Sequence, residues 1–247
     1  QELDDISHGE GEMNSTNGVS GNAAVMGGIT TSLRQKDIPI LSVHDGPSGI
    51  RMDYTGSLLP SGAALAASFN EKYVEDLYAS FSKELKDNAI DVILGPGLNI
   101  IRNPLNGRNF EYFSEDPLLS GMIAAACIKG IQSDDSISAT PKHFAANNQE
   151  ANRERVDDLV TERALREIYL RNFEIMVKEG KPRSIMMSYN KINGIWSHYN
   201  YELATSMLRE EWGWNGLAMT DWWMRLGTSR EFPDVRDDAY RIRSQVD

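Results

Sequence analysis

Residues 217–223 read Leu-Ala-Met-Thr-Asp-Trp-Trp, a short apolar run that ends in a carboxylate and two indole side chains. The apolar part is short for a helix and predicts a buried strand over residues 217–220. Asp221 then stands at the carboxyl end of a strand, where barrel enzymes carry their catalytic groups. The alternative is that Asp221 caps a following helix, and the residues alone leave both readings open.

The same order, an apolar strand followed by polar side chains, recurs along the chain. Further strands are predicted over residues 40–43, 92–94, 138–142 and 184–187. The polar groups that follow them are His44 and Asp45, residues 99–115, Lys142 and His143, and Tyr189 and Asn190. Five strands therefore deliver polar groups at their carboxyl ends.

Amphipathic helices separate these strands. Asn70 is a predicted cap, and the helix after it carries Val74, Leu77, Tyr78, Phe81 and Leu85 on one face. Asp116 and Pro117 predict a second helix start, with the helix running through Ile131. Thr161 opens a third helix, which ends at Gly180 and Pro182, with Leu165, Ile168, Tyr169, Phe173 and Val177 facing inward. Two more helices are expected over residues 203–212 and 234–244.

Alternating helices and continuously apolar strands predict an α/β fold with a parallel sheet. An open doubly wound sheet collects strand ends only near a switch point, whereas a barrel brings all of them to one site. We therefore expect a (β/α)8-type, TIM-like barrel, collapsed or incomplete. Residues 1–32 are interpreted as a lead-in segment and residues 33–247 as the barrel domain, which breaks off before its last strand.

Composition excludes several classes of function. The formal net charge of the 247 residues is -11, which argues against nucleic-acid binding and suits a neutral ligand such as a sugar. No apolar run has the length of a membrane helix, and residues 1–17 do not resemble a signal peptide, so we expect a cytoplasmic protein while secretion stays open. The single Cys127 is expected to be buried, and the four histidines show no metal-ligand spacing.

The densest polar stretch, residues 95–117, mixes arginine, asparagine, glutamate and aromatic side chains that suit a polyol. Within it we expect Arg108 to contact the ligand. Glu111 is interpreted as structural, paired with Arg102 or Arg108, and Asp116 as a helix cap.

Two further groups of residues suit a sugar site. Lys142 and His143, together with Arg153, form a cationic, donor-rich wall that would favour the ionised form of a nearby carboxylate. Asp45 can accept two hydroxyl hydrogen bonds, and Arg51 can hold either Asp45 or the ligand. The competing interpretations are a buried structural pair for Lys142 and His143 and an Asx-turn for Asp45.

Six motifs in one order resemble the barrel domain of glycoside hydrolase family 3 β-glucosidases. They are Asp45-Gly-Pro-Ser-Gly-Ile-Arg51, Gly95-Pro-Gly-Leu-Asn-Ile100, Gly107-Arg-Asn-Phe-Glu-Tyr-Phe-Ser-Glu-Asp-Pro117, Lys142-His-Phe-Ala-Ala-Asn-Asn-Gln-Glu150, Ser188-Tyr-Asn-Lys-Ile-Asn-Gly194 and Thr220-Asp-Trp222. The stretch through Asn22-Ala-Ala24 resembles members whose domains are arranged in the reverse order.

The resemblance implies retaining hydrolysis of terminal non-reducing β-D-glucosyl residues, without a cofactor and without a metal. It makes Asp221 the nucleophile and places Trp222 against the sugar ring. The residues that would bind the glucosyl unit are Asp45, Arg51, Arg108, Lys142, His143, Arg153 and Tyr189. The partners implied are a β-glucoside or gluco-oligosaccharide and a second α/β domain; nucleic acid and membrane are not expected, and a homo-oligomer is compatible.

The acid/base of the family normally comes from that second α/β domain, and no matching segment occurs in this chain. Glu111 and Glu150 match positions whose family role looks structural. Three alternatives stay open: a β-xylosidase, an α-arabinosidase, or a catalytically silent sugar-binding fragment. Hexosaminidases are less favoured because residues 147–150 replace their His-Gly-rich loop.

Overall fold

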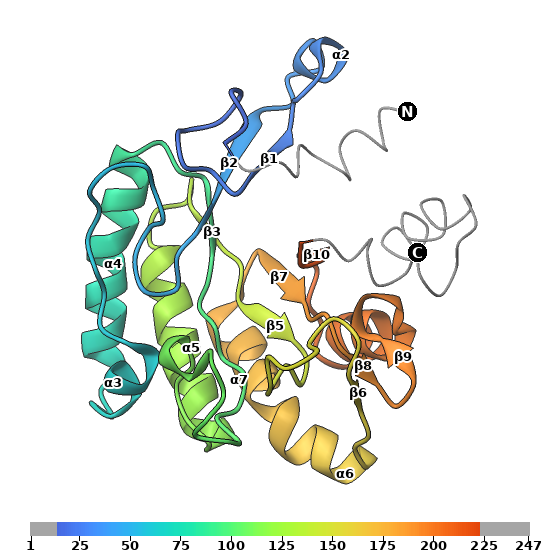
Figure 1. Ribbon diagram of the computed structural model, residues 1–247. Helices are drawn as coiled ribbons and strands as arrows, with labels where there is room; N and C mark the ends of the chain where they lie inside the picture. Colours follow the sequence, from blue (N-terminus) through green and yellow to red (C-terminus); the bar gives the residue numbers. More distant parts are fainter. Residues whose placement is uncertain (1–13, 223–247) are drawn as a thin grey trace.

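A computed structural model describes residues 14–222, so the helix expected over residues 234–244 lies outside the described residues. Three long helices stand side by side along one face of the strands (Figure 1). They are α4 (Glu71–Asp87), α5 (Pro117–Ile131) and α7 (Arg171–Gly180). The fold is therefore the layered α/β arrangement that the sequence predicts.

Two sheets of mainly parallel strands carry the site. The first has the order β1 (Ala24–Gly27), β2 (Ile40–Asp45), β3 (Val92–Leu94) and β4 (Ser138–Ala139). Its strands are parallel except β1, which runs antiparallel to β2. The second is wholly parallel, in the order β10 (Leu217–Met219), β7 (Ser184–Met187) and β5 (Lys142–Phe144). A small third sheet joins β6 (Asp157–Asp158), β8 (Lys191–Ile192) and β9 (Ile195–Trp196).

The described strands do not close into a barrel. In the backbone pairing, the first two sheets are linked by one parallel bridge between Gly97 and Lys142. The strand predicted over residues 138–142 is divided between them, because Pro141 has no N–H to continue the ladder and the chain changes partner there. Parallel α/β organisation is thus confirmed, while the described residues show two sheets where the sequence predicts one continuous barrel wall.

Helix starts agree with the caps expected from sequence. The Asn70 side chain accepts a hydrogen bond from the backbone N–H of Tyr73 at the start of α4. Asp116 does the same for Leu118 at the start of α5, with Pro117 in the first turn. The buried face of α4 comprises Val74, Tyr78, Phe81, Ser82 and Leu85.

The third predicted helix has three parts: α6 (Glu162–Ala164), the wider turn η2 (Leu165–Tyr169), and α7. The extra residue in the wide turn rotates the faces of the helix, so Ile168 is exposed, and its predicted inward position is wrong. The helix ends at Gly180 as expected, and the next residue, Lys181, adopts the left-handed conformation. The helix predicted over residues 203–212 is observed as the wide-turn helix η4 (Glu202–Glu211). The remaining short elements are α2 (Thr31–Arg34), α3 (Gly62–Ala66), η1 (Asn109–Glu111) and η3 (Ser197–Tyr199).

The core has two parts. The larger fills the space between the helices and the strands and includes the buried Cys127. The smaller lies among strands of both sheets and comprises Ala24, Val43, Val92, Leu94 and Met186, with Ala23, Met26, Met219 and Trp222 packed against it. Both sheets therefore turn apolar side chains toward a common interior. Within residues 14–222, no helix combines the length and apolar character that crossing a membrane requires.

Candidate active site

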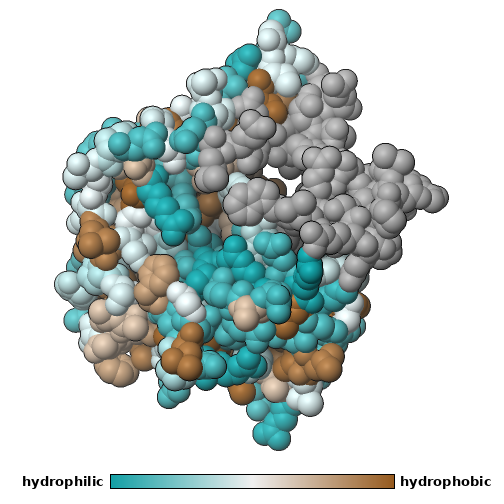
Figure 2. All heavy atoms as spheres, in the orientation of Figure 1, coloured by the Kyte–Doolittle hydropathy of each residue, from teal (hydrophilic) through white to brown (hydrophobic). Residues whose placement is uncertain are grey.

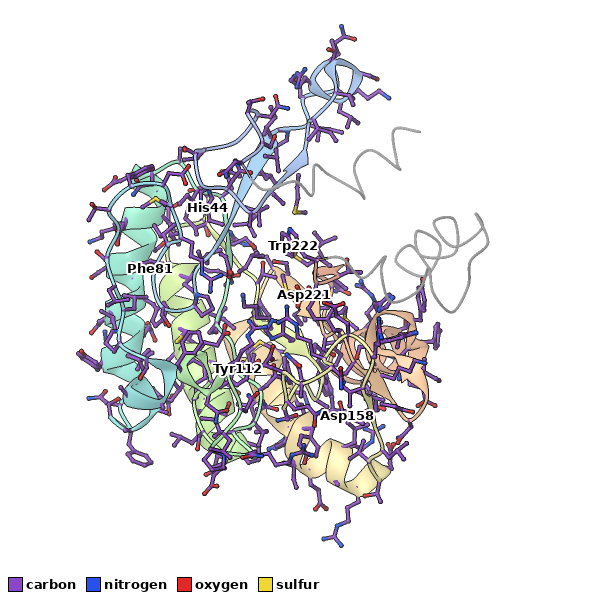
Figure 3. The ribbon with its side chains drawn as sticks, viewed as in Figure 1. His44, Phe81, Tyr112, Asp158, Asp221 and Trp222 are labelled. Carbon is purple, nitrogen blue, oxygen red and sulfur yellow. The ribbon has the colours of Figure 1, made fainter. Side chains whose placement is uncertain are left out.

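The polar residues predicted from sequence come together at one edge of the parallel strands. Asp45 is the last residue of β2, Lys142 and His143 begin β5, and Asp221 follows β10. In Figure 3, Trp222 and Asp221 lie one above the other near the centre, below the β1–β2 pair. Figure 2 shows hydrophilic residues gathered in the middle of this face. Segments far apart in sequence thus share one polar edge.

Asp45 is the centre of a charged cluster. Its Oδ1 accepts a hydrogen bond from the Lys142 ammonium at 2.7 Å, and its Oδ2 accepts one from Arg51 at 2.6 Å. Burial disfavours the charged carboxylate, but the Lys142 ammonium, helped by Arg51, outweighs burial, so the pKa of Asp45 lies below its ordinary value. Arg51 is largely exposed, so water screens its charge, whereas Lys142 is buried. Lys142 therefore stabilises the ionised form of Asp45 more strongly than Arg51 does.

His143 lies beside Asp221, with Nε2 3.6 Å from the carboxylate Oδ2. The register of the β5–β7 pairing shifts between Lys142 and Phe144, and both Lys142 and His143 reach the polar edge there. Burial is the largest cause of a pKa of His143 well below its ordinary value, and nearby cations lower it further. The imidazole is therefore neutral at physiological pH.

Asp221 is nearly buried, with 11% of its side chain exposed. Its Oδ1 accepts a hydrogen bond from the backbone N–H of Trp222 at 2.7 Å, and the Tyr189 hydroxyl donates to the same carboxylate. Burial raises the pKa of Asp221 above its ordinary value, and the Lys142 ammonium is the strongest opposing influence. Two opposing influences thus act on the pKa of Asp221. Burial favours the protonated carboxyl, and the nearby donors and cations favour the ionised carboxylate.

Arg153 and Tyr189 pack against each other next to Asp221. The guanidinium of Arg153 lies over the Tyr189 ring, 4.7 Å from its centre, and donates to Glu150 at 2.9 Å. Burial and the Asp221 carboxylate raise the pKa of the Tyr189 phenol, which therefore stays protonated. Arg153 is thus held against the tyrosine that contacts Asp221.

Arg108 donates from Nε to Oε1 of Glu111 at 2.5 Å. Glu111 is therefore paired with Arg108, one of the two partners expected from sequence. Its other oxygen, Oε2, has no hydrogen-bond partner among the described residues. The positive charge of Arg108 also acts on Asp45 and Asp221.

The Trp222 side chain connects the site to the start of the described chain. Its indole N–H donates to the carbonyl of Ala23 at 3.2 Å, and the ring packs against the smaller core cluster. The expected stacking of Trp222 on a sugar ring stays a prediction.

Comparison with known proteins identifies the family. The sequence model described as "Glycosyl hydrolase family 3 N terminal domain" matches residues 10–238. The chain belongs to glycosyl hydrolase family 3. A curated family relative from Ruminococcus albus, named "Beta-glucosidase", is 45% identical over 248 residues, which cover 100% of this chain and 26% of that protein.

Solved structures support the family assignment. A β-glucosidase from Paenibacillus barengoltzii has a TM-score of 0.86 and 53% identity, over 90% of this chain and 24% of the other. β-Glucosidase 3B from Thermotoga neapolitana, solved in complex with glucose, has a TM-score of 0.83 and 42% identity, over 90% of this chain and 32% of the other. The chain thus spans about a quarter to a third of the family 3 proteins it matches.

Two buried residues that the sequence did not single out as functional hold the site together. Asn99 accepts a hydrogen bond from the backbone N–H of His143 and donates to its carbonyl. The Tyr112 hydroxyl lies 3.4 Å from Nδ1 of His143. Both residues fall within family 3 motifs, but nothing in the sequence shows that they contact the histidine.

The site offers donors and acceptors without a cluster suited to a metal. Among residues 14–222, no group of three or more histidine, cysteine, aspartate or glutamate side chains is placed to hold a metal ion. Carboxylates, cations and a tyrosine hydroxyl at one edge suit a neutral polyol, which both accepts and donates hydrogen bonds.

Proposed function

We propose that this chain carries the glucoside-binding site and the nucleophile of a retaining β-glucosidase. The observation that supports the proposal most is the nearly buried Asp221 at a strand end, next to His143 and within the field of Lys142. The relative from Ruminococcus albus is named a β-glucosidase and the enzyme from Thermotoga neapolitana was solved with glucose, which supports the same substrate class.

In the first step, an oxygen of Asp221 attacks the anomeric carbon while the bond from that carbon to the leaving oxygen breaks. The leaving oxygen takes a proton from an acid/base carboxyl. In the second step, the same carboxyl removes a proton from water, whose oxygen replaces Asp221 on the anomeric carbon. The configuration is retained because the anomeric carbon is inverted twice.

The acid/base is proposed to lie in the second α/β domain of the whole protein. Glu111 is paired with Arg108, and Glu150 is paired with Arg153. Each glutamate thus already has a neighbouring guanidinium as its partner. These two contacts support structural roles for both glutamates.

The glucosyl unit is proposed to bind at the polar edge. Asp45 would accept a hydrogen bond from a sugar hydroxyl, since its carboxylate has about four lone pairs and Lys142, Arg51 and the backbone N–H of Gly46 use three of them. The other proposed binding residues are Arg51, Arg108, Lys142, His143, Arg153 and Tyr189, with Trp222 against the ring. We also propose that the two sheets form part of one barrel in the whole protein.

Trapping with 2,4-dinitrophenyl 2-deoxy-2-fluoro-β-D-glucoside tests the nucleophile. The dinitrophenolate leaves without a proton, so labelling does not need the acid/base. Mass analysis of peptides is expected to find the fluoroglucosyl group on Asp221. Asp221→Asn should abolish labelling, and Asp158→Asn, a matched change away from the nucleophile, should preserve it. Labelling of another residue would overturn the assignment, and glucose binding without any labelling would favour the sugar-binding fragment.

A second candidate substrate is a pentopyranoside. An exo-α-(1→6)-L-arabinopyranosidase from Bifidobacterium longum is 43% identical over 203 residues, 77% of this chain and 27% of that protein. A panel of aryl β-glucoside, β-xyloside and α-L-arabinopyranoside with the whole protein separates the candidates. Equal or faster turnover of a pentoside would replace the glucosidase proposal.

A further inference from the structure

Asn99 fixes the main chain of His143 but not the position of its ring proton. The Asn99 Oδ1 accepts from the His143 backbone N–H at 2.9 Å, and its Nδ2 donates to the His143 carbonyl at 2.8 Å. These two bonds together set the orientation of the amide. Asn99 is buried, so the arrangement is shielded from water.

The neutral ring carries one proton, which can sit on either nitrogen. Nδ1 lies 3.3 Å from Oδ1 of Asn99 and 3.4 Å from the hydroxyl of Tyr112. Nε2 lies 3.6 Å from Oδ2 of Asp221. The three neighbours therefore decide the tautomer.

The proton of Tyr112 is the deciding group. Tyr112 is fully buried, and its hydroxyl oxygen faces the side-chain N–H of Asn147 at 3.5 Å, which can only donate. Within residues 14–222, the remaining hydrogen-bond partner of this hydroxyl is Nδ1 of His143. A buried hydroxyl without an acceptor is unfavourable, so the Tyr112 proton points at Nδ1.

We propose that Tyr112 is a positioning residue that holds His143 in the tautomer protonated on Nε2, by donating its hydroxyl proton to Nδ1. In the opposite tautomer, Nδ1–H would donate to Asn99, but Tyr112 would lose its acceptor. The lone pair of Nε2 would then face the Asp221 carboxylate, whose full charge outweighs the partial charge of an amide oxygen.

The tautomer decides what His143 offers to a ligand. With the proton on Nε2, the imidazole presents an N–H donor on the side of Asp221. A sugar hydroxyl can accept this hydrogen bond and donate its own proton to another acceptor in the site. The role of His143 in sugar binding rests on the proposed function, whereas the tautomer itself does not. A measurement of the tautomer without ligand therefore tests this proposal separately from the proposed function.

Long-range proton–nitrogen correlation spectra of the chain labelled with ¹⁵N-histidine measure the tautomer. The His143 signals are assigned by their loss in His143→Gln. We expect the wild type to show a protonated Nε2 and an unprotonated Nδ1. Tyr112→Phe should shift the ratio of tautomers toward Nδ1–H by about fivefold or more, the equivalent of one hydrogen bond. Tyr78→Phe is the matched control, because Tyr78 is equally buried but donates to the carbonyl of Pro47.

A wild-type proton on Nδ1, or a folded Tyr112→Phe with unchanged His143 signals, overturns the proposal. If Tyr112→Phe does not fold, 3-fluorotyrosine in the wild-type chain replaces it. The more acidic phenol should move the Nδ1 signal of His143 and leave that of His44 in place, since His44 contacts Ser42 and a backbone carbonyl. No movement at His143 overturns the proposal, whereas absence of labelling at Asp221 would overturn only the proposed function.

Discussion

The ammonium of Lys142 lies 2.7 Å from Oδ1 of Asp45, across a separation of 97 residues in sequence. Lys142 is almost fully buried, with 4% of its side chain exposed, and Asp45 retains 23%. A buried ammonium is stable only when a carboxylate compensates its lost hydration. The contact therefore joins the two sheets and places a positive charge beside Asp221 at the same time.

We expect Asp45→Asn to lower the free energy of unfolding by about 2 kcal/mol. That figure is below the usual loss for a fully buried pair because Asp45 is partly exposed. Arg51→Met removes the exposed cation on the same carboxylate and should change stability by less than about 1 kcal/mol. Urea unfolding at pH 7 measures both. A larger loss for Arg51→Met than for Asp45→Asn would contradict this division of roles.

Removal of the Lys142 charge should alter the ionisation of Asp221. Lys142 opposes the effect of burial on Asp221, so in Lys142→Met the pKa of Asp221 should rise further. The rate of labelling by the fluoroglucoside, measured against pH, should then have its acidic midpoint moved upward by up to about one unit. Arg51→Met is the control, and a downward movement in Lys142→Met would refute the electrostatic role.

Asp158 is expected to destabilise the fold when it is ionised. Burial, with a contribution from the neighbouring Asp157, raises the pKa of Asp158 to about 6, against the opposing charge of Arg102. Because the folded-state pKa is the higher one, the penalty is full above about pH 6 and disappears below the unfolded value. Asp158→Asn should therefore stabilise the protein by about 1 kcal/mol at pH 8, after allowance for partial exposure.

Urea unfolding of wild type and Asp158→Asn at pH 8 and pH 5 tests this expectation. The stabilisation should be larger at pH 8 than at pH 5. An equal gain at both values would point to packing rather than ionisation as its cause.

Gly130 allows α4 and α5 to approach closely. A Cβ at this position would lie 2.4 Å from the Glu75 carbonyl oxygen and 2.6 Å from Cβ of Tyr78. Gly130→Ala should therefore cost about 1–3 kcal/mol of stability, despite the higher helix propensity of alanine. Lys129→Ala, at the exposed neighbouring position, serves as the control in thermal unfolding. A stabilised Gly130→Ala would show that the helices separate without penalty.

Local signals made much of the fold predictable. The strands at Val92–Leu94 and Ser184–Met187 are short apolar runs, and the caps Asn70 and Asp116 mark helix starts by simple chemistry. The exposure of Ile168 was not predictable, because a wide helical turn depends on tertiary packing rather than on local periodicity.

The grouping of Asp45, Lys142, His143 and Asp221 was predicted from their places after predicted strands, although Lys142 and His143 turn out to begin β5. The contacts of Asn99 and Tyr112 with His143 could not be predicted from the sequence. Buried polar side chains find their partners across the fold, and residue spacing carries no information about a contact between positions 112 and 143. The antiparallel strand at Ala24–Gly27 also went unpredicted.

The hydrogen bond from the Trp222 indole to the Ala23 carbonyl spans 199 positions. An expression boundary drawn at residue 33, where the predicted barrel domain begins, would delete the acceptor and the β1 strand next to it. The residue that follows the proposed nucleophile would then lose its anchor. Trimming the first 27 residues should thus impair sugar recognition as well as folding, because it removes both the acceptor for Trp222 and the buried β1 strand, although none of those residues belongs to the proposed sugar site.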